Sequence, residues 1–238
     1  MHLAHGVLTV TLVFPLADQV QRASRIQRWS AHLLSILAIR VEVSGVLPQS
    51  GAVPVMMAAN HVSWLDIYVI NAVRAARFVA KSEIRDWPLL GWFSEKAGTL
   101  FIERARWRHI VTVNAQLAAG LRQGDTFAVF LEATTSTGSV VMPFHGSLLQ
   151  PVIECGVPLH PVAIRYSRAD GSLCGEADYQ GDKSLFGTLL LMISQPVICA
   201  RLHFLPPPES AGKHRRELAR EATQLIALRL GVPVIDGM

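Results

Sequence analysis

Apolar residues along the chain form short runs of β character that alternate with longer segments of helical periodicity. The runs predict strands at 53–59, 78–80, 100–102, 127–131, 161–166 and 197–204. The longer segments predict helices at 65–74, 87–96, 107–122, 144–156 and 213–230. This alternation indicates an α/β fold, a single domain with a mixed central β-sheet flanked by helices. An apolar stretch at 185–193 best fits a buried core helix, but an acyl tunnel or a membrane contact would give the same pattern.

The N-terminal 45 residues have a different pattern. An apolar run at 6–17 is interrupted by Pro15 and is shorter than the ~20 residues that a bilayer crossing needs. No lysine or arginine precedes this run, so we do not expect a secretory signal. A helical pattern then places basic residues on one face (Arg22, Arg25, Arg28, His32) and apolar residues on another (Ile26, Trp29, Leu33, Ile36, Leu37). Such a helix either lies at a membrane interface or packs on the domain as an ordinary amphipathic helix.

Composition favours work at a lipid surface, because half of the 238 residues are hydrophobic and only 17% are charged. The mean hydropathy is +0.32. A net charge of +4 favours anionic partners such as phospholipid head groups, nucleotide phosphates or an acidic carrier protein. No nucleic-acid-binding signature accompanies this charge, so we expect no nucleic acid partner. Three widely spaced cysteines predict neither a disulfide framework nor a metal site.

The segment with the most informative chemistry reads Asn60-His61-Val62-Ser63-Trp64-Leu65-Asp66. A histidine can take a proton from a hydroxyl, while a carboxylate on its other ring nitrogen fixes the tautomer. The chain shows no serine or cysteine nucleophile to complete a triad, so the hydroxyl would come from a substrate. The pair therefore predicts direct group transfer, with His61 and Asp66 as catalytic residues.

Helical geometry restricts how this pair can meet. At ~100° per residue, positions five apart lie ~140° apart around a helix axis and cannot share a face. We therefore expect His61 on the loop after a strand and Asp66 in the first turn of the next helix. The alternative is that Ser63 and Asp66 form a capping box and only satisfy backbone N–H groups.

Four sequence blocks, beginning with the one at 60–66, resemble the glycerolipid acyltransferase family, the lysophosphatidic acid acyltransferases. The family's first block is NHxSxxD, and its second ends in FIxR, here Phe101-Ile102-Glu103-Arg104. Its third block is FPEGTRS, here Phe130-Leu131-Glu132-Ala133-Thr134-Thr135-Ser136, and its apolar fourth block fits residues 157–164. Three positions depart from the third block: Leu131 replaces proline, Ala133 replaces glycine and Thr135 replaces arginine.

The resemblance implies transfer of a fatty acyl group from acyl-CoA or acyl carrier protein to the free hydroxyl of a lysolipid, without a cofactor. The expected acceptor is 1-acyl-sn-glycerol-3-phosphate, giving phosphatidic acid. Because related proteins with two threonines in the third block acylate lyso-ornithine lipid or other lysolipids, these are the alternative acceptors. The resemblance also implies that Arg104 and Lys81 contact phosphate, and that Glu132, Thr134 and Thr135 contribute to acceptor binding. A threonine at 135 would grip phosphate less well than arginine.

Several further expectations follow from the resemblance. Backbone N–H groups of Val62 and Ser63 are candidate donors to the oxyanion that forms during transfer. Residues 1–45 are expected to associate with a membrane, at the cytoplasmic face of the inner membrane, and residues 46–238 to form the acyltransferase domain. Two rival functions are an esterase, for which the chain has no Gly-x-Ser-x-Gly motif, and a lipid-binding protein without turnover.

Overall fold

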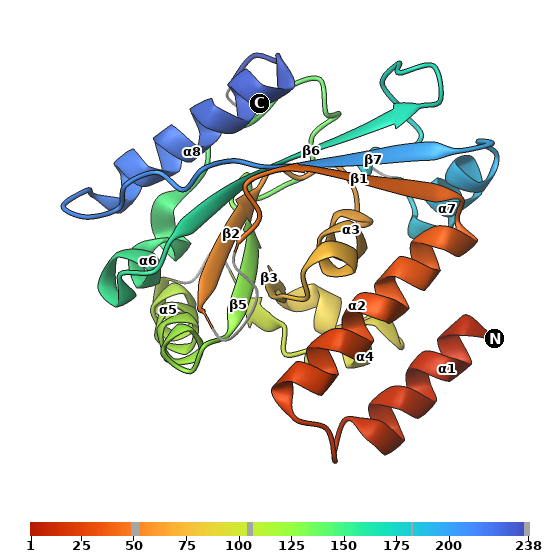
Figure 1. Ribbon diagram of the computed structural model, residues 1–238, viewed down its shortest axis with the longest axis horizontal. Helices are drawn as coiled ribbons and strands as arrows, with labels where there is room; N and C mark the ends of the chain where they lie inside the picture. Colours follow the sequence, from red (N-terminus) through yellow and green to blue (C-terminus); the bar gives the residue numbers. More distant parts are fainter. Residues whose placement is uncertain (49–52, 104–106, 182, 236–238) are drawn as a thin grey trace.

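The computed structural model shows a layered α/β protein with a strongly twisted central sheet (Figure 1). The structure describes residues 1–48, 53–103, 107–181 and 183–235. Within these residues the sheet has seven strands in the order β1-β7-β6-β2-β5-β3-β4. The strands are β1 (Ile39–Gly45), β2 (Val55–Ala59), β3 (Arg77–Lys81), β4 (Leu100–Ile102), β5 (Thr126–Phe130), β6 (Leu159–Arg168) and β7 (Ile198–Phe204). The expected mixed α/β fold is confirmed.

All neighbouring strands run parallel except β6 and β7, which pair antiparallel. Because β2, β3, β4 and β5 are parallel, their carboxyl ends meet at one edge of the sheet, where α/β proteins commonly bind ligands. β2 is buried at every position, as expected of a central parallel strand covered on both faces. This arrangement brings the loops after residues 59 and 130 together.

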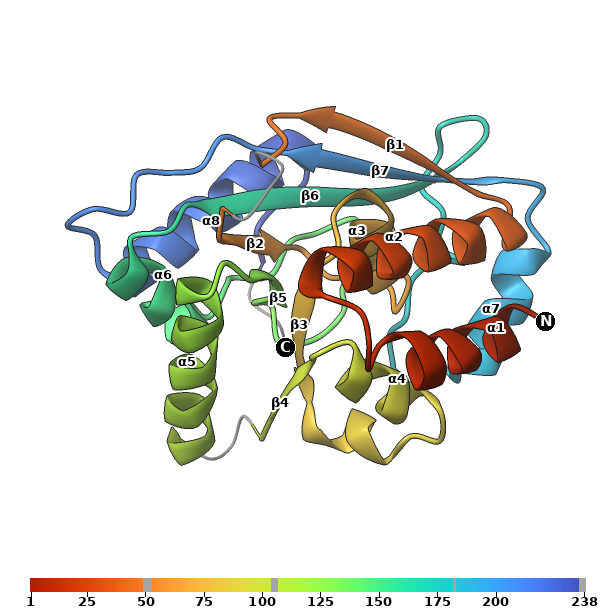
Figure 2. The same ribbon diagram turned by 60° about the horizontal axis from the view of Figure 1, so that its bottom comes forward.

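Helices cover both faces of the sheet (Figures 1 and 2). One apolar core joins the sheet to the face that carries α5 (Trp107–Arg122), α6 (Gln150–Cys155) and α8 (Arg215–Leu230). A second core joins it to the face that carries α2 (Gln19–Ile36), α3 (Asp66–Val73) and α7 (Leu185–Ile193). Along the chain, the 3-10 turn η2 (Ser82–Asp86) and α4 (Leu90–Lys96) connect β3 to β4. The helix expected at 144–156 is instead a short 3-10 turn, η3 (Gly146–Leu148), followed by α6.

The N-terminal segment forms a helical hairpin in which α1 (His2–Leu8) and the π-helical turn η1 (Thr9–Val13) precede α2. The His2 ring stacks on Trp29 with 4.3 Å between ring centroids. Gly6 permits this close approach, since a Cβ there would lie 2.7 Å from the Trp29 indole nitrogen. Trp29 also contacts Tyr68 and Phe93, so the aromatic side of α2 packs on the domain. The sequence left two alternatives for α2, a helix at a membrane interface or an ordinary amphipathic helix packed on the domain. For this face of α2, the structure shows the packed helix.

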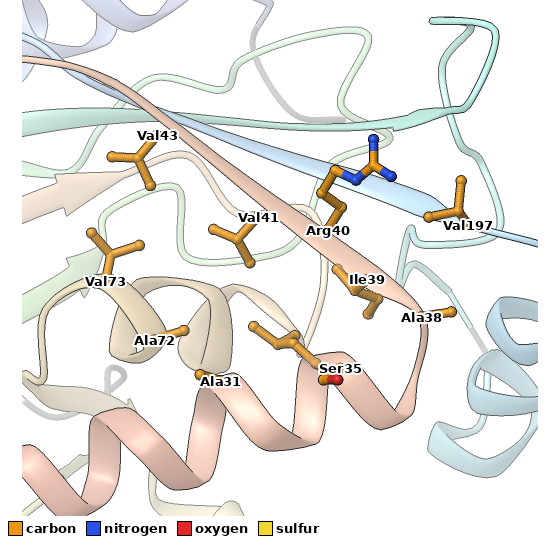
Figure 3. A pocket seen from close by; sticks show the side chains of 11 residues that line it. Ala31, Ser35, Ala38, Ile39, Arg40, Val41, Val43, Ala72, Val73 and Val197 are labelled. Carbon is orange, nitrogen blue, oxygen red and sulfur yellow. The ribbon is translucent and has the colours of Figure 1, made fainter.

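Strand β1 was not expected from the sequence. It pairs with β7 at the edge of the sheet, although residues 39–45 were expected to belong to the N-terminal segment. Its valines Val41 and Val43 point toward α2 and α3 and line an apolar groove of about 610 Å³ (Figure 3). The groove is bordered by Ala72 and Val73 at the end of α3, and none of the predicted site residues lines it.

Candidate active site

His61 and Asp66 meet at the turn between β2 and α3. The His61 Nδ1 atom lies 2.8 Å from Asp66 Oδ2. His61 is on the loop after β2, and Asp66 is the first residue of α3, as the spacing of the motif predicted. The side chain of Asp66 is fully buried, whereas 21% of the His61 side chain is exposed. A reactant can therefore approach the ring of the histidine but not the carboxylate.

The Asp66 carboxylate also holds the backbone of its own turn. Its Oδ2 atom accepts hydrogen bonds from the N–H groups of Val62 (2.8 Å) and Ser63 (2.9 Å). Since this oxygen is an acceptor for two fixed donors, His61 Nδ1 must carry the proton that it shares with Asp66, leaving Nε2 with its lone pair. Asp66 therefore pairs with His61 and also satisfies backbone N–H groups of its own turn, so the two interpretations of this residue are compatible. The expectation that the Val62 and Ser63 N–H groups stabilise an oxyanion is wrong, because Asp66 already occupies both.

Asn60 ties this turn to the neighbouring strand. Its fully buried side chain donates from Nδ2 to the Ile164 carbonyl (3.0 Å) and accepts from the Ile164 N–H (2.8 Å). These two bonds imitate a pair of sheet hydrogen bonds and extend the β2 to β6 pairing by one residue beyond the strand. The asparagine of the first block therefore positions the His61 that follows it.

Two residues of the site were not predicted from the sequence. The buried Tyr166 on β6 donates from its hydroxyl to Asp66 Oδ1 at 2.6 Å, and burial first, then the charge of Asp66, raises its pKa well above the usual range. The phenol therefore stays protonated and donates. The Phe130 ring stacks on His61, with centroids 4.0 Å apart and an interplanar angle of 11°. Phe130 and Tyr166 lie 64 and 100 residues after Asp66, so only the fold reveals their contacts with the pair.

Glu132 follows β5 and lies beside the turn at 60–66, called here the candidate catalytic turn. It is only 3% exposed, and within the described residues neither carboxyl oxygen makes a hydrogen bond of normal geometry. The pKa of this carboxyl is raised to about 9, chiefly by burial and also by the charge of Asp66, against the opposing effect of the N–H groups of His61 and Met142. Glu132 is therefore a neutral acid at pH 7, with an O–H available to a bound reactant.

This shifted pKa predicts how stability depends on pH. Between about pH 4.5 and 9 the unfolded chain has lost the Glu132 proton while the folded protein keeps it, so the contribution of this group to stability falls as pH rises. Glu132→Gln keeps the shape and has no proton to lose. In urea unfolding, the free energy of unfolding of Glu132→Gln relative to that of the wild type should increase with pH, by up to about 1.4 kcal/mol per pH unit. The exposed Glu95→Gln should show no such trend, and a flat difference for Glu132→Gln would contradict the assignment.

Comparisons with known proteins agree with this geometry. A protein-family model described as "Acyltransferase" matches residues 38–165. The lyso-ornithine lipid O-acyltransferase of Pseudomonas aeruginosa is 39% identical over 217 residues, which cover 91% of this chain and 82% of that protein. The chain belongs to the acyltransferase family. It is an O-acyltransferase enzyme, and the family suggested by the sequence blocks is confirmed.

Other acyltransferases are similar over much of the chain. The 1-acyl-sn-glycerol-3-phosphate acyltransferase of Neisseria meningitidis is 35% identical, over 77% of this chain and 71% of that protein. A crystal structure of the 1-acyl-sn-glycerophosphate acyltransferase PlsC from Thermotoga maritima superposes with a TM-score of 0.67, covering 96% of this chain and 86% of that one. At 22% identity, this likeness shows that the two proteins share a fold.

Ala133 stands where the family's third block has glycine, and its backbone has a φ of +68°. L-residues other than glycine are disfavoured in this left-handed region, so the position retains the conformation that glycine adopts readily. The acyltransferase thus tolerates local strain next to Glu132. The sequence alone could not show whether the position needs a positive φ.

The strain at Ala133 predicts a stabilising substitution. Ala133→Gly should raise the free energy of unfolding by about 0.5–1 kcal/mol, because glycine relieves the left-handed backbone and loses only part of that gain to unfolded-state entropy. The matched control, Ala119→Gly on the exposed side of helix α5, should lower stability by about 1 kcal/mol. Urea denaturation measures both, and destabilisation by Ala133→Gly would show that other contacts of Ala133 dominate.

The two predicted threonines of the third block have different surroundings. Thr135 is half-buried; its hydroxyl donates to the Tyr179 carbonyl, and its own carbonyl accepts from the Gln180 side chain at 2.7 Å. Thr134 is exposed. In addition, Ser136 N–H donates to the His61 carbonyl at 2.7 Å. The third block therefore holds the loop at 179–180 against the candidate catalytic turn.

Of the two predicted basic contacts, the structure describes Lys81. Lys81 is exposed at the carboxyl end of β3, the edge at which β2 and β5 also end. This location is compatible with a contact to an anionic reactant. Arg104 lies outside the described residues, two positions after β4 ends at Ile102.

Proposed function

We propose that this acyltransferase moves a fatty acyl group from an acyl thioester to the hydroxyl of a lysolipid, with His61 as the general base. The observation that carries the proposal is the His61 Nδ1 to Asp66 contact, which directs Nε2 toward the exposed side. Nε2 has no hydrogen-bond partner in the part of the chain that the structure describes. Ser63 does not compete as a nucleophile, because it is fully buried and its hydroxyl accepts from the Leu65 N–H.

In the proposed reaction, Nε2 of His61 removes the proton from the acceptor hydroxyl as its oxygen attacks the thioester carbonyl. The tetrahedral intermediate collapses by breaking the C–S bond, and the thiolate takes the proton from the imidazolium. The products are an ester and a free thiol. Asp66 stabilises the transient positive charge on the ring, and Tyr166 holds the carboxylate in place.

We assign Glu132 to acceptor binding. Glu132 is buried beside His61, and its contacts with the N–H groups of His61 and Met142 leave its hydrogen-bonding capacity incomplete, which suggests a reactant that completes it. A neutral carboxyl can both donate to and accept from a hydroxyl or a head group, and it adds no repulsion to Asp66. In this role, Glu132 orients the hydroxyl that His61 deprotonates.

We propose lyso-ornithine lipid as the preferred acceptor, with 1-acyl-sn-glycerol-3-phosphate second. Support comes from the similarity to the Pseudomonas enzyme over 91% of the chain. The third block agrees, because Thr135 replaces an arginine that could grip a phosphate and its hydroxyl is already bound to Tyr179. The phosphatidic acid reaction has support from the Neisseria relative.

An acceptor panel tests this function. Purified protein would be incubated with radiolabelled acyl-CoA or acyl carrier protein and, separately, with lyso-ornithine lipid, 1-acyl-sn-glycerol-3-phosphate and a neutral monoacylglycerol. Acylated lyso-ornithine lipid as the fastest product supports the proposal. Release of free fatty acid alone would instead indicate an esterase, and binding of lipid without any product would indicate a lipid carrier.

We further propose that the N-terminal hairpin attaches the enzyme to an anionic bilayer at the cytoplasmic face of the inner membrane. The hairpin has five exposed apolar residues, called here the N-terminal apolar residues, whose exposed fractions run from 51% to 88% (Leu3, Leu8, Leu12, Leu16, Val20). Exposed Arg22 and Arg28 follow on α2 and could bind anionic head groups. No helix among the described residues has both the length and the hydropathy needed to span a membrane.

Vesicle flotation tests the attachment. Leu12→Asp should reduce binding to vesicles of anionic phospholipid by roughly tenfold or more, since burial of one such side chain contributes about 1.5–3 kcal/mol. Leu228→Asp provides the control, because Leu228 is 82% exposed on α8. Equal losses for both variants, or unchanged binding for Leu12→Asp, would show that the N-terminal apolar residues do not mediate the attachment.

A further inference from the structure

A cavity of about 570 Å³ borders the candidate catalytic turn on the side of β5 and α8. Its wall includes Phe130, the residue that stacks on His61, and Ala133, which follows Glu132. Apolar side chains contribute to its lining (Ile102, Ile110, Phe144, Leu148). A volume of this size is typical of sites for small molecules and cofactors. The cavity therefore lies next to the residues around His61 and has a partly apolar lining.

The lining of this cavity is also cationic. Arg215 and Arg216 from the first turn of α8 line it, together with His145. Arg215 is half-buried, and Arg216 and His145 are exposed. Within the described part of the chain, neither guanidinium has an ion pair or a hydrogen bond to an acid. The nearby acids are engaged elsewhere, since Glu217 caps the N–H of His214 and Glu221 pairs with Lys213.

Short contacts fix the start of α8, which carries the two arginines, relative to the loop after β5. The His145 N–H donates to the Leu131 carbonyl at 2.9 Å, and the Phe144 N–H donates to the buried Thr223 hydroxyl at 3.0 Å on α8. Gly146 touches the start of α8 so closely that a Cβ would lie 2.6 Å from the Arg215 carbonyl oxygen. The two arginines are therefore held at a set position from the loop that carries Glu132.

We propose that Arg215 and Arg216 form a subsite for the phosphate of a reactant whose remaining chain runs through the cavity to His61. The inference rests on the proposed function. Guanidinium groups bind phosphate with paired hydrogen bonds, and the apolar part of the lining suits the carbon atoms of the chain that carries the phosphate. A thioester donor carries such a phosphate on its pantetheine arm, and a phosphate-bearing lysolipid carries one on its head group. If lyso-ornithine lipid is the acceptor, the phosphate belongs to the donor.

Donors with and without phosphate test this subsite. Initial rates would be measured for wild type and for Arg215→Gln, Arg216→Gln and the double variant, using acyl-CoA and the matched acyl N-acetylcysteamine thioester. Each substitution should raise KM for acyl-CoA by about tenfold, the value of one charge-assisted hydrogen bond, and leave the phosphate-free donor within about twofold of wild type. A second arm compares 1-acyl-sn-glycerol-3-phosphate with monoacylglycerol, using the phosphate-free donor.

The outcomes separate the two sources of phosphate. A selective loss with acyl-CoA places the donor at the subsite, and a selective loss with the phosphate-bearing acceptor places the acceptor there; either supports the proposal. Equal losses with phosphate-free substrates, or no loss with any substrate, would overturn it. The control is Arg220→Gln, an exposed arginine of α8 that does not line the cavity. Wild-type transfer from the phosphate-free donor reports on the proposed function itself, independently of the variants.

Discussion

His61→Ala should lower kcat for acyl transfer by about 10²–10⁴-fold, the contribution usually made by a general base. The ring nitrogen that faces the exposed side disappears, and no other described residue donates to or accepts from that position. The cost in stability should stay below about 2 kcal/mol, because the variant loses the stacking contact with Phe130 and one donor to Asp66. Product formation from labelled acyl thioester measures the rate, and thermal unfolding measures stability.

The matched control is His203→Ala. His203 lies on β7 and hydrogen-bonds Ser44, two strands away from β2 in the sheet. This variant should retain wild-type turnover. If His61→Ala keeps more than about a tenth of wild-type kcat, proton removal by this imidazole is not the main catalytic contribution and the proposed mechanism fails.

Asp66→Asn should lower kcat by roughly 10²–10⁴-fold, because the neutral amide no longer stabilises a positive imidazolium or secures its tautomer. The structure also predicts a folding cost. The Oδ2 atom receives three donors, from His61 and from the Val62 and Ser63 N–H groups, and each bond to a charged acceptor weakens when the charge is lost. We expect a loss of about 1–3 kcal/mol in urea unfolding.

Tyr166→Phe separates the two roles of Asp66. It removes one donor to Oδ1 but leaves the carboxylate charge and its contact with His61 intact. Its kcat should therefore fall much less than that of Asp66→Asn, although its stability should fall by a similar amount. Unchanged turnover in Asp66→Asn would mean that Asp66 only secures the turn, as a helix cap does.

The failures of the sequence analysis have identifiable physical causes. Residues 39–45 alternate apolar and polar side chains with Ile39, Val41 and Val43 on one face, which is a strand signal, but the preceding helical pattern extends to their border. The apolar face of α2 was ambiguous because packing on a protein and insertion into lipid require the same periodicity. Contacts of Trp29 with Tyr68 and Phe93 resolved that ambiguity.

The third block illustrates a different limit. The glycine-to-alanine change at Ala133 was visible in the sequence, but its meaning depended on a φ angle that sequence does not encode at one position. Similarly, Glu132 was recognised from its block, while its neutral state follows from burial that many distant residues create. The partners of Thr135 come from residues 44 and 45 positions away.

The sequence by itself determined the α/β architecture, the family and the proximity of His61 to Asp66, because these depend on local periodicity and on short sequence blocks. The tertiary structure alone decided that Tyr166 and Phe130 complete the site, that the Val62 and Ser63 N–H groups already bind Asp66, and that Arg215 and Arg216 line the cavity beside the candidate catalytic turn. These features join residues that are distant in the chain or compete for the same donor. Such relations depend on three-dimensional packing, and no local pattern of residue types specifies them.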